Sequence, residues 1–149
     1  MKTIEVASAV IFDADRRVLI ALRRKDDAFG HTWEFPGGKI DDDESQTFGL
    51  CREIREELGV TINVFPRPMI TCAFGPPLTK QTAYNVSLYA CQIAPHEPAP
   101  QCIECEEIQW VEWDRIPKPC MPAISVWQSY VERIGGIALM EQGLFVEQR

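Results

Sequence analysis

The stretch that decides the fold runs from Phe35 to Val60 and reads FPGGKIDDDESQTFGLCREIREELGV. It begins close to a Gly-Gly pair, which lets a ligand approach the main chain closely. An acidic loop follows, and then a segment with helical periodicity that ends at Gly59. This order predicts a turn that leads into a helix carrying carboxylates, a geometry suited to holding a divalent metal ion against a phosphate chain.

Residues 45–58 form the strongest helical pattern in the chain. One apolar residue per turn makes a stripe that we expect to be buried: Leu50, Ile54 and Leu58. Asp43 and Gln46 have the spacing of a capping box at the start of this helix. Gly59 is a natural stop at its end.

Three glutamates share one face of this predicted helix. Glu53, Glu56 and Glu57 are spaced i, i+3 and i+4, so their carboxylates repel one another. A hard cation such as Mg²⁺ or Mn²⁺ prefers carboxylate oxygens and would turn that repulsion into binding. Arg52 lies four residues before Glu56 and can orient its carboxylate. An exposed acidic helix face is the alternative interpretation.

Composition restricts the classes of partner. The chain has 149 residues, of which 46% are hydrophobic, which fits one domain with a sizeable core. Its formal net charge of -7 argues against a nucleic-acid polymer or an anionic membrane as partner. A small anionic substrate stays possible because metal ions can invert the local field. The chain lacks a long apolar run and a signal-peptide layout, so we expect a cytoplasmic protein.

Six cysteines are present: Cys51, Cys72, Cys91, Cys102, Cys105 and Cys120. Cys102 and Cys105 form a Cys-x-x-Cys pair. A zinc or redox role would need a second pair of ligands, or a helix that starts after the first cysteine, and the acidic flanking residues indicate neither. We therefore expect ordinary reduced cysteines.

The remaining segments predict an α/β protein. Residues 3–12 and 18–22 read as two strands joined in a hairpin by a polar turn. Further strands are expected within residues 61–72, 81–93 and 108–113. A second helix is expected from Pro122 to about Gly135, with Trp127 and Tyr130 in the core.

Positive charges and one aromatic ring lie where a substrate could meet the glycine turn. Arg23 and Arg24 close the second predicted strand, and guanidinium groups suit phosphate or base contacts. Phe35 can stack on a base, and Lys39 directly follows the Gly-Gly pair. We expect these four residues to contact substrate.

The central stretch resembles a known family. Gly38, Glu44, Arg52-Glu53-Ile54, Glu56-Glu57 and Gly59-Val60 match the Nudix box, Gly-x5-Glu-x7-Arg-Glu-U-x-Glu-Glu-x-Gly-U, in which U is a bulky aliphatic residue. The box fixes nine positions over 23 residues. The entry Trp33–Lys39 and the Trp110-Val111 segment are similar to the MutT-like branch of the Nudix hydrolases. This resemblance implies an α/β/α sandwich, in which a mixed sheet lies between the box helix and a C-terminal helix.

The resemblance also implies roles for individual residues. Arg52 would orient the carboxylates, and Glu53 would act as general base for the attacking water. The implied metal ligands, for Mg²⁺ or Mn²⁺, are Gly38 through its carbonyl, Glu53, Glu56, Glu57 and a later carboxylate, which is Glu104 here with Glu107 as the fallback. Glu44 would support the loop.

The implied reaction is that of a Mg²⁺-dependent pyrophosphohydrolase that converts a (d)NTP to (d)NMP and pyrophosphate, as in sanitation of the nucleotide pool and DNA repair. Cys120 stands where enzymes that read oxidised guanine offer an amide to the base, so a preference for 8-oxo-dGTP is in question. Pro76, in turn, lies where ADP-ribose-cleaving relatives often carry a proline.

ADP-ribose or nucleotide-sugar cleavage is therefore an alternative, and a non-catalytic Nudix sensor or interaction module is a second one. A monomer or a homodimer is expected, with a small nucleotide as the binding partner.

Overall fold

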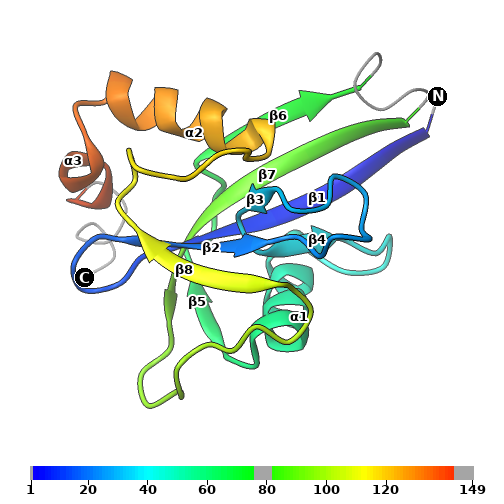
Figure 1. The fold of residues 1–149 in the computed structure, drawn as a ribbon, viewed down its shortest axis with the longest axis horizontal. Coiled ribbons are helices and arrows are strands. Elements are labelled where there is room, and N and C mark those ends of the chain that lie inside the picture. Colours follow the sequence, from blue (N-terminus) through cyan, green and yellow to red (C-terminus); the bar gives the residue numbers. More distant parts are fainter. Residues whose placement is uncertain (1, 76–81, 143–149) are drawn as a thin grey trace.

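The computed structural model describes residues 2–75 and 82–142. Its elements, in chain order, are β1 (Lys2–Ile11), β2 (Val18–Leu22), β3 (Trp33–Glu34), β4 (Gly37–Lys39), α1 (Gln46–Leu58), β5 (Ile62–Val64), β6 (Ile70–Phe74), β7 (Thr82–Ile93), β8 (Glu107–Val111), α2 (Pro122–Arg133) and α3 (Ile137–Glu141). Figure 1 shows a curled arrangement of strands with α1 and α2 on different sides.

The strands form two sheets. The larger has the order β4-β1-β7-β5, and β6 also pairs with β7. Its centre is a long parallel ladder between β1 and β7, from Lys2 opposite Thr82 to Ile11 opposite Cys91. The smaller sheet has the order β3-β2-β8. The larger sheet is therefore mixed, as the family resemblance implied.

The expected hairpin between the first two strands is wrong. β1 belongs to the larger sheet and β2 to the smaller one, and the backbone pairing between the end of the first predicted strand and β2 is an isolated bridge between Phe12 and Val18. The turn between them is tight, with Asp13 accepting hydrogen bonds from the backbone N–H groups of Asp15 and Arg17. A short polar turn predicts a change of direction, but whether the flanking strands pair depends on partners elsewhere in the chain.

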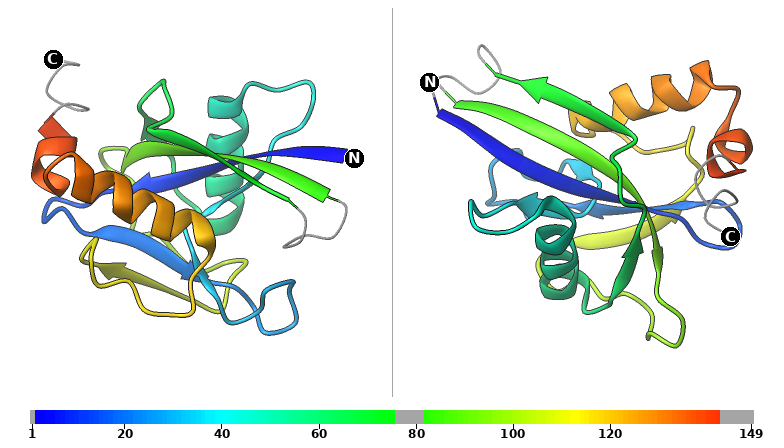
Figure 2. Two further views of the ribbon diagram at one scale, coloured as in Figure 1. Left: turned by 90° about the horizontal axis from the view of Figure 1, so that it is seen from above. Right: turned by 180° about the vertical axis from the view of Figure 1, so that it is seen from behind.

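Alternation along β1 divides the core between the two helices. Ala7, Ala9 and Ile11 pack in one cluster with the stripe of α1, which is Leu50, Ile54 and Leu58. Val10 and Phe12 pack in the other cluster with α2, including Trp127. The two helices thus cover opposite faces of the strands, as the turned views in Figure 2 also show. The predicted sandwich and the buried position of Trp127 are confirmed.

The ends of α1 follow local chemistry. Ser45 is the N-cap, and its hydroxyl accepts a hydrogen bond from the backbone N–H of Phe48 at 3.2 Å. The expected capping box between Asp43 and Gln46 is therefore wrong, because the helix begins at Gln46, so Ser45 rather than Asp43 occupies the N-cap position. Gly59 ends the helix at φ 72°, in the left-handed region, as predicted.

The C-terminal part adds a second layer over the α2 side. Pro122 occupies the first turn of α2, where a missing N–H costs no hydrogen bond. α3 follows and buries Met140 against the same cluster.

No helix in the described residues is both long and apolar enough to cross a membrane. Pro76, on which the ADP-ribose alternative depends, lies outside the described residues.

Candidate active site

The site begins where β4 packs against α1. Gly38 has no side chain here, and a Cβ added to it would lie 2.5 Å from the carboxylate of Glu53. Any larger residue would push Glu53 away, so the glycine is needed for close approach. The side chain of Glu53 is only 16% exposed. Burial raises the pKa of Glu53, with a smaller contribution from the charge of Glu56.

Arg52 links the carboxylates of the loop and the helix. Its Nε and one terminal nitrogen bind both oxygens of Glu44, at 3.1 and 2.6 Å. The other terminal nitrogen reaches Glu53 at 3.2 Å and Glu56 at 3.4 Å. Arg52 therefore makes its two-nitrogen contact with Glu44, and it reaches Glu56, the carboxylate it was expected to orient, through a single nitrogen. These bonds hold the pKa of Glu44 below its usual range.

Glu44 also shapes the loop before α1. One of its oxygens accepts a hydrogen bond from the backbone N–H of Asp41 at 2.9 Å. A Cβ added to Gly49 would lie 2.6 Å from the same carboxylate. Glu44 is thus packed into the start of the helix, which agrees with the supporting role implied for it.

Glu57 lies beneath the glycine turn and accepts a hydrogen bond from the Gly37 N–H at 3.3 Å. Burial raises its pKa to about 8, and the nearby charges of Glu34 and Glu53 add to the rise. Burial and the neighbouring carboxylates disfavour the ionised form of Glu57. A positive charge placed nearby would stabilise that form. Glu56, the third glutamate of the face, is the outermost, with 49% of its side chain exposed.

Glu104 comes from the loop before β8 and lies near the same carboxylates. It lines a hollow of about 200 Å³ together with Glu34 and Glu57, and its charge raises the pKa of both Glu53 and Glu57. Glu107, the fallback, is on β8 and accepts a hydrogen bond from Gln109. Of the two, the structure brings Glu104 to the site.

The donor set fits a divalent cation by its chemistry. Carboxylate oxygens from two directions and a backbone carbonyl at Gly38 are ligands that Mg²⁺ accepts. Among the residues that the structure describes, no three acidic, histidine or cysteine side chains are gathered tightly enough to hold an ion as they stand. The carboxylates of Glu53 and Glu56 accept hydrogen bonds from Arg52, and that of Glu57 accepts one from the Gly37 N–H. Binding an ion would therefore require small shifts of these side chains.

A larger cavity of about 440 Å³ adjoins the carboxylates. Its walls are mostly apolar and come from the larger sheet, the loop after β2 and the start of α2. Arg23, Glu34 and Gly37 line both this cavity and the smaller hollow beside Glu57. The two hollows are therefore neighbours with a common wall.

The predicted substrate residues divide between this cavity and its surroundings. Arg23, Phe35 and Lys39 line it, although Phe35 is almost buried and its ring meets Trp127 edge-on, with centroids 5.2 Å apart. Arg24 and Cys120 stand outside its lining as the described residues form it. Arg24 instead bonds to Ile103, and Cys120 packs against the core near Trp33.

Several cavity residues were missed by sequence reasoning. Phe29 overhangs the cavity with 57% of its surface exposed, at a positive φ of 57°. Ser8 and Tyr84 come from β1 and β7. Glu34 bonds Arg23 at 2.8 Å and so holds it against the wall. Alternation along the strands could have assigned Ser8 and Tyr84 to one face, but their distance from the box in sequence gave no sign that this face is the site.

The cysteine pair also differs from expectation. Cys102 and Cys105 are joined in a disulfide, so the prediction that all cysteines are reduced is wrong for these two. Cys51, Cys72, Cys91 and Cys120 are free. Folding back of the loop brings the two thiols together, a contact that spacing alone permitted but did not require.

Comparison with known proteins places the chain in a family. The NUDIX domain family matches residues 2–126. Two curated relatives are the CTP pyrophosphohydrolase of Escherichia coli (47% identical over 64 residues, 43% of this chain and 47% of the relative) and the 8-oxo-dGTP diphosphatase of Proteus vulgaris (41% identical over 61 residues, 41% and 54%). The chain thus belongs to the NUDIX family, with MutT-like relatives. Its matches span about half the length of those relatives.

Solved structures agree on the fold. The MutT NUDIX hydrolase of Burkholderia pseudomallei superposes with a TM-score of 0.75 at 24% identity, over 88% of this chain and 99% of that one. The solution structure of the E. coli ORF135 protein gives a TM-score of 0.69 at 28% identity, over 90% and 91%. The Nudix sandwich predicted from the box is therefore the fold of this chain.

Proposed function

We propose that this protein is a Mg²⁺-dependent pyrophosphohydrolase that converts nucleoside triphosphates to nucleoside monophosphates and pyrophosphate. The observation that carries the proposal is the common wall between the carboxylate hollow and the apolar cavity. A nucleoside in the cavity would place its phosphate chain against the carboxylates. Nudix hydrolases as a class use divalent cations, and the names of the relatives, CTP pyrophosphohydrolase and 8-oxo-dGTP diphosphatase, point to triphosphates.

In this proposal Glu53 is the general base. Its raised pKa brings it closer to the pH at which a base both accepts and releases protons efficiently. Water loses a proton to Glu53, its oxygen bonds to phosphorus, and the anhydride bond breaks with pyrophosphate leaving. Arg52 orients Glu53 and Glu56 through the bonds described above.

The residues that would hold the metal are Gly38 through its carbonyl, Glu53, Glu56, Glu57 and Glu104. A bound divalent cation supplies charge neutralisation of the phosphate chain and a lower pKa for water. The raised pKa of Glu57 supports its assignment, because a cation would replace the proton that this buried carboxylate otherwise holds.

Substrate choice would come from the cavity. Its polar side chains are few, and Arg23, held by Glu34, is the group best placed to meet a base or a phosphate. Lys39 is exposed at the rim and would meet phosphate. Cys120, which was expected to face the base, is absent from the cavity lining that the described residues form, whereas its neighbour Met121 is part of it.

A hydrolysis screen with Mg²⁺ tests the proposal. The substrates are the common nucleoside triphosphates and their deoxy forms, 8-oxo-dGTP, 5-substituted pyrimidine nucleotides, ADP-ribose and nucleotide sugars. We expect pyrophosphate from at least one triphosphate, and no activity after Mg²⁺ is removed by EDTA. Cleavage of ADP-ribose in clear preference to every triphosphate would contradict the proposal.

A further inference from the structure

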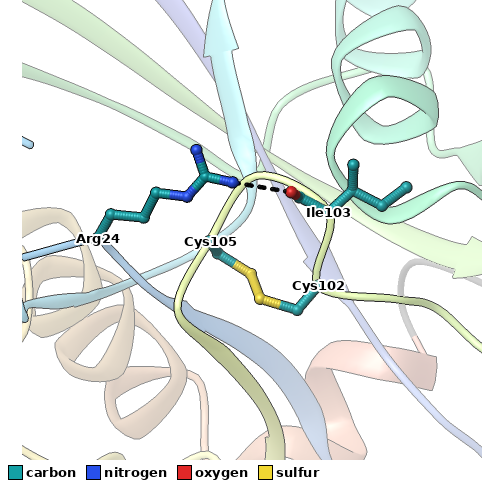
Figure 3. Close-up of a disulfide and its surroundings, with 4 residues drawn as sticks. All are labelled: Arg24, Cys102, Ile103 and Cys105. Carbon is teal, nitrogen blue, oxygen red and sulfur yellow. Dashed lines mark hydrogen bonds between the residues drawn. A yellow bond between two sulfur atoms is a disulfide. The ribbon is translucent and has the colours of Figure 1, made fainter.

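The loop before β8 is closed by the disulfide between Cys102 and Cys105, and Glu104 lies inside the closed ring. Figure 3 shows this loop with Ile103 at its turn and Arg24 reaching it from the end of β2. The guanidinium of Arg24 donates a hydrogen bond to the carbonyl of Ile103 at 2.9 Å. We call residues 101–105 the Glu104 arm.

The arm is attached to the C-terminal end of α1, the helix that carries the box glutamates. The backbone N–H of Gln101 donates to Leu58 at 2.9 Å, and that of Ile103 donates to Glu57 at 3.0 Å. These bonds satisfy carbonyl groups that the end of a helix leaves without partners. A Cβ added to Gly59 would lie 3.2 Å from the side chain of Ile103, so the arm rests on the helix stop.

A purely stabilising role for this disulfide is weak on physical grounds. The two cysteines are three residues apart, and a ring this short removes little conformational freedom from the unfolded chain. Both cysteines are half-buried and are flanked by the exposed Gln101, Ile103, Glu104 and Glu106. A thiol reductant can therefore reach the bond.

We propose that the Cys102–Cys105 disulfide is a redox-sensitive positioning device for Glu104. In the closed form the ring, the two backbone bonds and Arg24 together hold Glu104 in the hollow beside Glu57. In the open form the two backbone bonds and the bond from Arg24 persist without the ring, and Glu104 gains freedom to leave the hollow. The proposal rests on the proposed function, because it treats Glu104 as a ligand of that site.

The switching chemistry is thiol–disulfide exchange with a dithiol. One thiolate of the dithiol attacks a sulfur of the bridge, the bond between Cys102 and Cys105 breaks, and a mixed disulfide forms. The second thiolate of the reagent then displaces the protein sulfur. The dithiol is oxidised to its cyclic disulfide, and the two electrons and two protons it loses end on the thiols of Cys102 and Cys105. An oxidised dithiol reverses the reaction.

Three measurements without substrate test the proposal. Alkylation and mass spectrometry count free thiols, which we expect to rise by two on treatment with a dithiol. Binding of Mn²⁺ alone, followed by electron paramagnetic resonance, is expected to weaken about tenfold in the reduced form, the range seen when an orienting partner of a ligand is lost. Amide hydrogen exchange at Gln101 and Ile103, in metal-free protein, is expected to speed up on reduction.

Variants test whether the redox response comes from the Cys102–Cys105 disulfide and acts through Glu104. Replacing both Cys102 and Cys105 by serine should weaken Mn²⁺ binding as reduction does and abolish the response to dithiol. Cys51→Ser is the matched control, because Cys51 is a free cysteine on α1 whose thiol donates to the carbonyl of Ile62, and its redox response should equal that of the parent protein. Glu104→Gln should weaken Mn²⁺ binding in the oxidised form and remove its redox dependence.

Arg24 distinguishes positioning from substrate contact. If it holds the arm, Arg24→Ala weakens Mn²⁺ binding when no substrate is present, and Arg24→Lys restores part of it. Equal Mn²⁺ affinity of oxidised and reduced protein, or an unchanged affinity in Glu104→Gln, would overturn the proposal. Failure to hydrolyse any nucleotide would instead overturn the proposed function, while a redox-dependent Mn²⁺ affinity would still stand.

Discussion

The carboxylate side and the cavity side of the site are built in different ways. On the carboxylate side, four of the five implied metal ligands come from the 20 residues between Gly38 and Glu57, and local geometry brings them together. On the cavity side, the wall is assembled from β1, the loop after β2, β7 and the start of α2. One side is fixed by helix spacing and one turn, and the other depends on how distant segments pack.

This difference separates chemistry from selectivity. A substitution in the box should change the reaction whatever the substrate, because in the proposed function the reacting phosphates meet the same carboxylates each time. A substitution in the cavity should change affinity for one nucleoside relative to another, because only the walls meet the base. The predictions below test whether the two sides are as independent as the structure indicates.

The largest effect is expected on the carboxylate side. Glu53→Gln keeps the shape of the side chain but removes the base, so kcat should fall about 100- to 10,000-fold. Steady-state kinetics with the best triphosphate would show this, with KM little changed. The matched control is Glu132→Gln on the exposed face of α2, which should retain full activity. Equal losses in both variants would mean that Glu53 has no special role.

The next effect concerns stability in the absence of metal. Glu57 has its pKa raised from 4.5 to about 8 in the folded protein, so the folded state binds this proton more tightly than the unfolded state. The resulting stabilisation is fully present below pH 4.5 and is lost as the pH rises through about 8. Urea unfolding in EDTA should therefore show stability falling over this window by up to a few kcal/mol.

Glu57→Gln is the matched variant for that measurement, because its amide oxygen can still accept the bond from the Gly37 N–H. We expect the free energy of unfolding of this variant to decline less as the pH rises. In the parent protein, added Mg²⁺ should reduce the decline. A variant whose stability falls as steeply as that of the parent would show that Glu57 is not the group responsible.

A moderate effect is expected from narrowing the cavity. Ala123 lines it in the first turn of α2, so Ala123→Phe should raise KM for triphosphates about tenfold while kcat and Mn²⁺ affinity change little. Ser125→Phe adds the same ring on the exposed side of that helix and serves as the control. A fall in Mn²⁺ affinity on Ala123→Phe would show that the two sides are coupled.

The smallest effect tests the start of the box helix. Ser45→Ala removes the hydroxyl that accepts from the Phe48 N–H and should cost about 1 kcal/mol of stability. Asp43→Ala, which removes the residue that the sequence pattern favoured as the cap, should change the free energy of unfolding by much less. Chemical denaturation measures both, and the reverse order would restore the capping-box interpretation.

Prediction from the sequence succeeded where one element supplied the information. The buried stripe of α1, its stop at Gly59 and the sandwich fold follow from residues that are neighbours in sequence or in a helix turn. It failed for the pairing of β1 and β2, because β1 pairs with β7, in which Lys2 lies opposite Thr82 and Ile11 opposite Cys91, eighty residues further along the chain. A polar turn carries no information about that competitor.

The same limit applied to individual side chains. Glu104 was assigned from the family resemblance, and the structure places it beside Glu57. Arg24 has the same type and almost the same position as Arg23, yet it faces the Glu104 arm while Arg23 faces the cavity. Consecutive residues near the end of a strand point to opposite sides, and the sequence does not say which side is the site.

The sequence by itself determined the family, the box helix and the carboxylates it presents, because helix periodicity fixes which residues share a face. Only the tertiary structure decided which strands pair and where the cavity opens, because each of these depends on contacts between segments far apart in the chain. It also decided that Cys102 meets Cys105, because spacing alone did not say that the loop folds back between them. The raised pKa of Glu57 belongs with them, since burial and the approach of Glu34 produce it.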